Sequence, residues 1–224
     1  MSSKASKVIN RICYMVLIPF VSIIHVMLNR YRTDVHNIKT LIDELIPFNK
    51  FFIIPYVYWF AYIFVVLTFF AVVDYRYYFR LLMSIIAGMF VCFIVYYFFP
   101  TTVPRPEVFG NDMLSRLVRF VYSKDNPYNC FPSIHVLNAL LVTLFFCDYY
   151  KGRILRALSI ISCVLISLST LFVKQHYVLD VVSSALLGSC MYLMFTNDYL
   201  WSRVPVKRII DFLVPSKARD INGV

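Results

Sequence analysis

Long runs of apolar residues, separated by short polar segments, constrain this chain more than any other feature. Of its 224 residues, 60% are hydrophobic and only 15% are charged. Soluble globular domains contain roughly 45–50% apolar and about 25% charged residues. A helix that crosses a membrane needs roughly 20 mostly apolar residues. The sequence therefore argues against an ordinary soluble domain and predicts an integral membrane protein.

Six segments are apolar and long enough to be predicted as membrane-spanning helices. The expected fold is all-α, a six-helix transmembrane bundle that forms a single domain over residues 1–224. The first segment is followed by HVMLNRYR rather than by small residues, so we expect a retained span and not a cleaved signal peptide. The predicted spans are residues 12–28, 52–73, 80–99, 132–149, 154–173 and 177–196.

The connector at residues 29–51 carries apolar residues at helical spacing, with charges on the other side. This pattern predicts either a short interfacial helix or an ordinary amphipathic connector. The apolar positions are Ile38, Leu41, Ile42 and Leu45.

The net charge of +10 predicts an orientation rather than a nucleic-acid partner, because the basic residues lie in short clusters between apolar runs. Six spans place both termini on one side of the membrane. The segments on that side contain more Lys and Arg than those on the other side, which predicts cytoplasmic termini. Anionic lipid head groups are the expected partners of the surplus charge.

Histidine and cysteine residues outside polar segments are expected to be structural. His25 lies within the first apolar run, where we expect a core histidine or one that faces lipid head groups. The six cysteines are scattered without a CxxC pair, and most are expected to be small buried residues. Cys130 lies in a polar loop, and the sequence assigns it no role.

Three polar segments interrupt the apolar pattern at one predicted face of the membrane. They read PRP, FPSIHV and VKQHYVLD, and each lies where a predicted span begins or ends. Ionisable residues within spans usually face a cavity and have a function. Those in these segments lie near span ends, and they are expected to converge at one level of the membrane interface. The candidate site residues in these segments are Arg105, Ser133, His135, Lys174, His176 and Asp180.

His176 and Asp180 are four residues apart, so they share one face if the last span begins as a helix near His176. A carboxylate bonded to one imidazole nitrogen fixes the tautomer and makes the other nitrogen more nucleophilic. Ser133 and His135 lie at a predicted helix start, where backbone amides bind anions. This chemistry fits phosphoryl transfer through a histidine nucleophile, with the second histidine as the proton donor.

Together these segments resemble the type-2 phosphatidic acid phosphatase superfamily, which shares its helical core with the vanadium haloperoxidases. The family has three motifs, Lys-x6-Arg-Pro, Pro-Ser-Gly-His and Ser-Arg-x5-His-x3-Asp, in this order. The matching residues here are Arg105 and Pro106, then Pro132, Ser133 and His135, then Ser169, His176 and Asp180.

The resemblance implies a role for each matching residue. His176 would attack phosphorus and form a phosphohistidine, and Asp180 would orient His176. His135 would protonate the leaving group, while Arg105 and Ser133 would bind phosphoryl oxygens. It implies a metal-free site without a cofactor, although two histidines and an aspartate can also bind zinc.

The chain departs from the family motifs at three positions. Phe98 and Thr170 replace a lysine and an arginine of the family, and Ile134 replaces the motif glycine. Positive charge at the phosphate must then come from other residues. Lys174 lies two residues before His176, and we expect it to replace one of the missing cations.

The resemblance implies a membrane lipid phosphatase, with an isoprenyl diphosphate, phosphatidate or phosphatidylglycerol phosphate as substrate. The segments FPSIH and QHYVLDV are more similar to the inositol phosphorylceramide and sphingomyelin synthase branch, so a head-group phosphotransferase is the alternative. A non-catalytic transporter or scaffold is the third possibility, and the lack of internal repeats argues against a transporter. The sequence does not decide the lipid, the acceptor or the oligomeric state.

Overall fold

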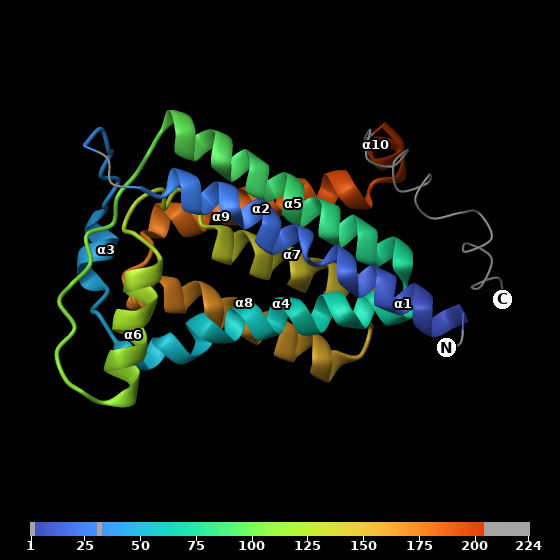
Figure 1. Cartoon of the computed structure of the whole chain (residues 1–224), viewed down its shortest axis with the longest axis horizontal. Coiled ribbons are helices and arrows are strands. Elements are labelled where there is room, and N and C mark those ends of the chain that lie inside the picture. The colour runs from blue at the N-terminus through green and yellow to red at the C-terminus, as the bar shows by residue number, and fades with distance from the viewer. Residues whose placement is uncertain (1–2, 31–32, 204–224) are drawn as a thin grey trace.

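A computed structural model describes residues 3–30 and 33–203 and shows a bundle of helices (Figure 1). These residues form no strand, only two isolated β-bridges, so the predicted all-α fold is confirmed. Helices α3 and α6 lie at one end of the bundle, and α10 lies at the other, where α1 begins. The helices are α1 Ser3–Tyr14, α2 Leu17–Leu28, α3 Leu41–Leu45, α4 Ile53–Val73, α5 Tyr75–Phe98, α6 Met113–Lys124, α7 Ile134–Tyr149, α8 Arg153–Phe172, α9 Val178–Thr196 and α10 Asp198–Arg203, with a 3-10 turn at Lys50–Phe52.

Five helical segments of the described chain are long and apolar enough to cross a membrane, which identifies an integral membrane protein. The remaining predicted span, residues 132–149, corresponds to α7, which is apolar but has only 16 residues. The predicted count of six is therefore not fully confirmed. The five segments are Val8–Leu28, Lys50–Val73, Tyr75–Phe98, Arg153–Phe172 and Val178–Thr196.

The short helix α7 is the central helix of the bundle. It packs against α4, α5, α8 and α9, and most of its side chains are buried. Two glycines allow this close approach, because a Cβ at Gly88 would lie 2.9 Å from Leu137 and a Cβ at Gly188 would lie 3.1 Å from Leu140. Small residues at helix contacts are typical of membrane bundles, in which packing replaces the hydrophobic effect.

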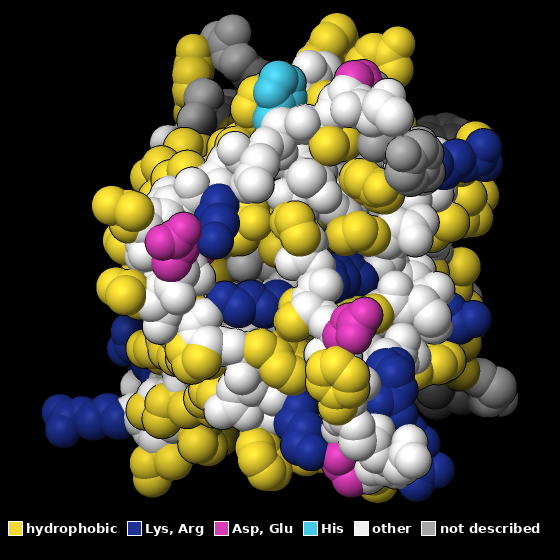
Figure 2. Space-filling model, turned by 90° about the vertical axis from the view of Figure 1, so that its left-hand side faces the viewer, with side chains coloured by type: hydrophobic (Ala, Val, Ile, Leu, Met, Phe, Trp, Pro, Cys, Tyr) yellow, Lys and Arg dark blue, Asp and Glu magenta, His cyan; other side chains and the backbone are white. Residues whose placement is uncertain are grey.

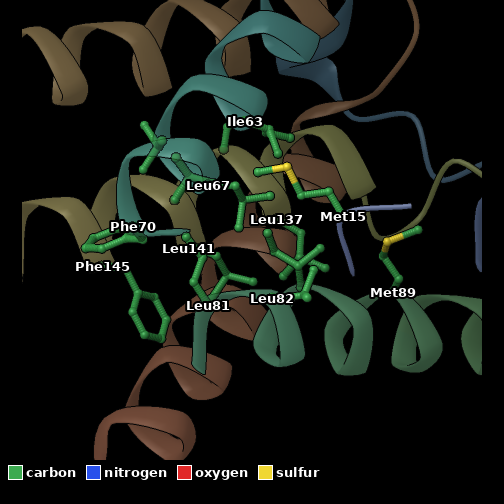
Figure 3. Packing of buried hydrophobic residues seen from close by; sticks show 14 of the residues in the cluster. Met15, Ile63, Leu67, Phe70, Leu81, Leu82, Met89, Leu137, Leu141 and Phe145 are labelled. Carbon is green, nitrogen blue, oxygen red and sulfur yellow. The ribbon is translucent and has the colours of Figure 1, made fainter. Parts of the chain in front are cut away.

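The largest cluster of buried side chains joins α7 to its neighbours (Figure 3). Leu137 and Leu141 of α7 meet Leu67 of α4 and Leu82 of α5, and each of these side chains is at most 1% exposed. By contrast, Leu186 of α9 is 66% exposed, as expected for a side chain that faces lipid. The core therefore fixes the position of α7, whose first turn carries His135.

Polar side chains stabilise the starts of several helices. Asp74 accepts hydrogen bonds from two backbone amides of α5, and Asp112 accepts one from Ser115 in α6. Ser133 does the same for α7 through the amide of Val136. These side chains satisfy amides that the helix leaves unpaired.

The predicted helix of the connector is limited to the five residues of α3. Thr40 and Asp43 form a capping box at its start, and it ends before Pro47, since a residue that precedes proline avoids the helical conformation. Leu41 and Leu45 are each 81% exposed, which suits a membrane interface.

The first prediction concerns the centre of the bundle. Leu137→Ala should reduce the free energy of unfolding by about 2–5 kcal/mol, because it leaves a cavity between closely packed helices. The matched variant Leu186→Ala should have little effect, because its side chain is already exposed. Thermal unfolding of both variants in detergent tests this. Equal destabilisation by the two substitutions would contradict the central position of α7.

Candidate active site

A cavity of about 320 Å³ lies among α2, α4, α5, α6, α7 and the segment before α9. Both predicted catalytic histidines, His135 and His176, belong to its wall. Their ring centroids are 5.8 Å apart, although His135 lies in α7 and His176 lies in the segment before α9. The structure therefore places the two histidines beside one shared space that can hold a substrate.

The predicted contact between His176 and Asp180 is present. Nδ1 of His176 lies 3.1 Å from Oδ2 of Asp180, and the same carboxylate oxygen accepts the backbone amide of Tyr177 at 2.9 Å. Asp180 is fully buried and His176 is 7% exposed. A carboxylate in this position makes Nδ1 the donor, which leaves Nε2 of His176 with its lone pair.

His135 lies in the first turn of α7 and is surrounded by aromatic side chains of α4. The hydroxyl group of Tyr56 is 3.1 Å from Nε2 of His135, and the ring of Trp59 is 4.6 Å from the imidazole ring. Tyr56 and Trp59 also line the cavity. These contacts restrict the orientation of His135 relative to the cavity.

Ser133 connects α7, which carries His135, with α9, which carries Asp180. Its hydroxyl oxygen accepts the amide of Val136, and its own amide donates to the carbonyl of Asp180 at 3.4 Å. The side chain is fully buried and is not part of the cavity wall. Its contacts in the structure are thus those of a helix cap rather than of a phosphate ligand.

Lys174 is directed toward the connector and not toward the cavity. Its ammonium group donates to the carbonyl oxygens of Asp43 and Ile46. Burial lowers the pKa of Lys174, although the nearby Asp43 charge acts in the opposite direction. Asp43 in turn accepts the amide of Val178 at 2.8 Å, at the first residue of α9. Lys174 and Asp43 therefore hold the segment that carries His176 against α3.

Arg105 also binds the protein itself. Its guanidinium group donates to the carbonyl oxygens of Tyr122, Asp125 and Asn126, and to the side-chain oxygen of Gln175. The side chain is 8% exposed and does not line the cavity.

Sequence reasoning missed several polar residues of the cavity wall. His25 belongs to this wall, so the interpretation of a purely structural histidine omits its position in the same cavity as His135 and His176. Its Nε2 lies 3.4 Å from Oδ1 of Asp125, which also accepts from Asn29 at 2.6 Å. Lys124 and Gln175 line the cavity as well. The general rule that an ionisable residue in a span has a function could have identified His25.

Asp125 is the acidic partner on this side of the cavity. Burial raises the pKa of its carboxyl group, but the hydrogen bond from His25 and the charges of His25 and Arg105 act more strongly in the other direction. The pKa of Asp125 consequently lies below its usual value, and the carboxylate is ionised at neutral pH.

Figure 2 shows the end of the bundle that carries α3 and α6. Lys and Arg side chains are spread over this face among hydrophobic ones. Some basic residues at this end bind other residues of the protein. Lys50 forms an ion pair with Asp112 at 2.7 Å, and Arg119 donates to the carbonyl of Gly110. A mixed basic and apolar face of this kind suits lipid head groups. In the described ranges, His, Cys, Asp and Glu residues form no group of three that could hold a metal ion.

A family model described as the PAP2 superfamily matches residues 38–194 of this chain. The chain belongs to the PAP2 superfamily. The match covers more than half of the sequence and includes every residue of the three motifs, so the resemblance seen in the motifs is confirmed. No curated protein and no solved structure matches the chain.

Membership in the PAP2 superfamily makes the departures from its motifs informative. Phe98, which replaces the motif lysine, is 77% exposed, so its side chain does not face the site. Thr170, which replaces the motif arginine, is fully buried, and its carbonyl oxygen accepts the amides of Gln175 and His176. Neither position supplies a positive charge. Among the lysines that the structure describes, Lys124 is the one that lines the cavity.

The second prediction concerns Lys174. Lys174→Met should lower the free energy of unfolding by about 1–2 kcal/mol, because two carbonyl oxygens lose a charged donor. The inhibition constant of orthovanadate should change little, since the ammonium group does not reach the cavity. Thermal unfolding and vanadate titration of the purified variant test this. A large loss of vanadate affinity with unchanged stability would instead support a phosphate-binding role.

Proposed function

We propose that this chain is a membrane lipid phosphatase that acts through a phosphohistidine intermediate. One observation carries the proposal: His135 and His176 line the same cavity, and Asp180 is bonded to His176 on the side away from Nε2. Membership in the PAP2 superfamily supports phosphatase activity at the level of the family. The apolar wall and the spanning helices favour a lipid phosphate or diphosphate as the substrate.

In the first step, the lone pair on Nε2 of His176 attacks phosphorus, and the bond between phosphorus and the leaving oxygen breaks. His135 gives a proton to that oxygen, so that the lipid alcohol or lipid phosphate leaves in its protonated form. Asp180 remains ionised and stabilises the positive charge that develops on the His176 ring. The product of this step is a phosphohistidine at His176.

In the second step, water attacks phosphorus and the bond between nitrogen and phosphorus breaks. His135 accepts a proton from the attacking water, which returns both histidines to their initial state. Inorganic phosphate is released. In this proposal the positive charge at the phosphate, expected from Lys174 and Arg105, comes from Lys124, which lines the cavity.

A head-group phosphotransferase is the second candidate, and the apolar wall of the cavity favours it. Trp59, Phe60 and Phe120 line the space next to His135 and limit the room for water. A lipid alcohol could then attack the same phosphorus in place of water. Product analysis with phosphatidate and phosphatidylinositol, each with and without diacylglycerol, separates the two reactions: inorganic phosphate indicates hydrolysis, and a new lipid head group indicates transfer.

The expected orientation has both termini in the cytoplasm and the cavity at the opposite face of the membrane. It rests on the distribution of Lys and Arg residues between the spans. Several basic residues in that argument, including Arg32, Lys207, Arg208, Lys217 and Arg219, lie outside the described residues. An accessible-cysteine assay at Glu107, which lies in the long segment before α6, would locate the cavity side.

The third prediction concerns the nucleophile. Purified protein given phosphatidate labelled with ³²P should release phosphate and, after rapid acid-free quenching, retain label on His176. His176→Ala should abolish both, while Asp180→Asn should slow turnover by about 10²–10⁴-fold because the tautomer is no longer fixed. Phosphate release by His176→Ala at the wild-type rate would show that the proposed mechanism is wrong.

The fourth prediction concerns the proton donor. His135→Ala should slow the cleavage of phosphatidate by about 10²–10⁴-fold, because its alkoxide leaving group needs a proton. The same variant should lose much less activity toward nitrophenyl phosphate when formation of the phosphohistidine is measured, since nitrophenolate leaves without protonation. A single-turnover comparison of the two substrates tests this, and an equal loss for both would exclude the role of His135 as the acid.

A further inference from the structure

Gln175 lies directly before the proposed nucleophile and forms part of the cavity wall. Its side chain is 1% exposed, and its backbone amide shares the carbonyl oxygen of Thr170 with the amide of His176. These two bonds hold Gln175 and His176 in one turn of the chain. The motifs assign no role to this glutamine.

The contact with Arg105 decides which end of the Gln175 amide is free. A guanidinium group carries donors only, so the atom that it contacts must be the amide oxygen. Oε1 of Gln175 therefore binds Arg105, and the NH₂ group is left at the other end. Nε2 is buried and has no hydrogen-bond partner among the residues that the structure describes.

A buried donor without a partner is rare in native proteins and calls for an explanation. Here the donor belongs to a residue of the cavity wall that directly precedes His176, the proposed nucleophile, in the chain. Phosphoryl oxygens are acceptors, and charge-assisted bonds from fixed donors are strong in a site that excludes water. A phosphoryl group in the cavity would satisfy Nε2.

We infer that Gln175 is a phosphate-binding residue, which donates from Nε2 to a phosphoryl oxygen of the substrate, and that Arg105 is a positioning residue that acts through Gln175. This inference rests on the proposed phosphoryl transfer at His176. A neutral amide would then take over part of the phosphate binding that the family assigns to a lysine and an arginine, which Phe98 and Thr170 replace here. It also explains why Arg105, whose guanidinium group is bonded to carbonyl oxygens, does not itself need to reach the cavity.

Gln175→Glu tests the binding role without disturbing the fold. The carboxylate keeps the shape of the side chain and an oxygen for Arg105, so thermal stability should be maintained. It replaces the NH₂ donor by an oxygen that repels phosphate. We expect kcat to fall by about 10²–10³-fold, the usual effect of losing one fixed donor to a developing charge. Binding of orthovanadate should weaken to a similar extent.

Asn37→Asp is the matched control, because it makes the same change from amide to carboxylate in the exposed connector between α2 and α3. It should leave activity and vanadate binding unchanged. If Gln175→Glu also binds vanadate with wild-type affinity, the assignment of Gln175 is wrong.

A double-mutant cycle tests how Arg105 acts. Arg105→Lys and Gln175→Met should each lower kcat, but Arg105→Lys should have no further effect in the presence of Gln175→Met, because it acts through the missing amide. The thermal unfolding midpoint of each variant separates this coupling from loss of structure. If the two effects multiply, Arg105 binds phosphate directly and its positioning role is wrong.

The outcomes distinguish this inference from the proposed function. Turnover that depends on His176 but survives Gln175→Glu would overturn the role of Gln175 and leave the phosphohistidine mechanism intact. Failure of the wild-type protein both to bind orthovanadate and to form a labelled histidine would overturn both. Loss of vanadate binding in Gln175→Glu, with the fold and the Asn37→Asp control unchanged, is the result expected from the structure.

Discussion

The buried carboxylate of Asp180 is the group on which the site depends most. It accepts Nδ1 of His176 and the amide of Tyr177, and its backbone carbonyl accepts the amide of Ser133. Asp180 thus caps the start of α9, fixes the tautomer of the proposed nucleophile and connects the start of α7 to the start of α9. A buried carboxylate needs hydrogen-bond donors. Here both donors to the carboxylate contact Oδ2, while Oδ1 is buried without a partner among the described residues.

The packing of α7 then determines where the second histidine lies. Because α7 is enclosed by four other helices, it needs neither the length nor the lipid-facing surface of an ordinary span. Its first turn borders the cavity, and Tyr56 and Trp59 of α4 contact His135 there. The connector adds a further constraint through Asp43. Its side chain accepts the amide of Val178 at the start of α9, and its carbonyl oxygen accepts a hydrogen bond from Lys174.

Local patterns predicted most of the fold. Apolar runs of membrane length located the helices, and the observed bounds of α4, α8 and α9 differ from the predicted spans by one residue. The spacing of His176 and Asp180 predicted their contact. The expected reason was wrong, since α9 begins only at Val178 and His176 reaches Asp180 from the segment before the helix. The length of α7 was overestimated, since Pro132 and Ser133 lie before the helix and the surrounding helices, not lipid, cover it.

Side-chain direction across long sequence separations could not be predicted. Lys174 lies two residues from His176, yet it points toward α3, and Arg105 points toward carbonyl oxygens of the α6–α7 loop. His25 comes from the distant helix α2, and only the packed bundle places it beside the site. Such positions depend on tertiary packing, which neither spacing nor composition encodes.

A crystal structure of the protein with bound orthovanadate is the most direct test of phosphoryl transfer at this histidine pair. We expect vanadium bonded to Nε2 of His176 inside the cavity, with an oxygen of the vanadate within hydrogen-bond distance of Nε2 of Gln175. Vanadate bound elsewhere, with His176 and His135 unchanged, would contradict the proposed phosphoryl transfer at this pair.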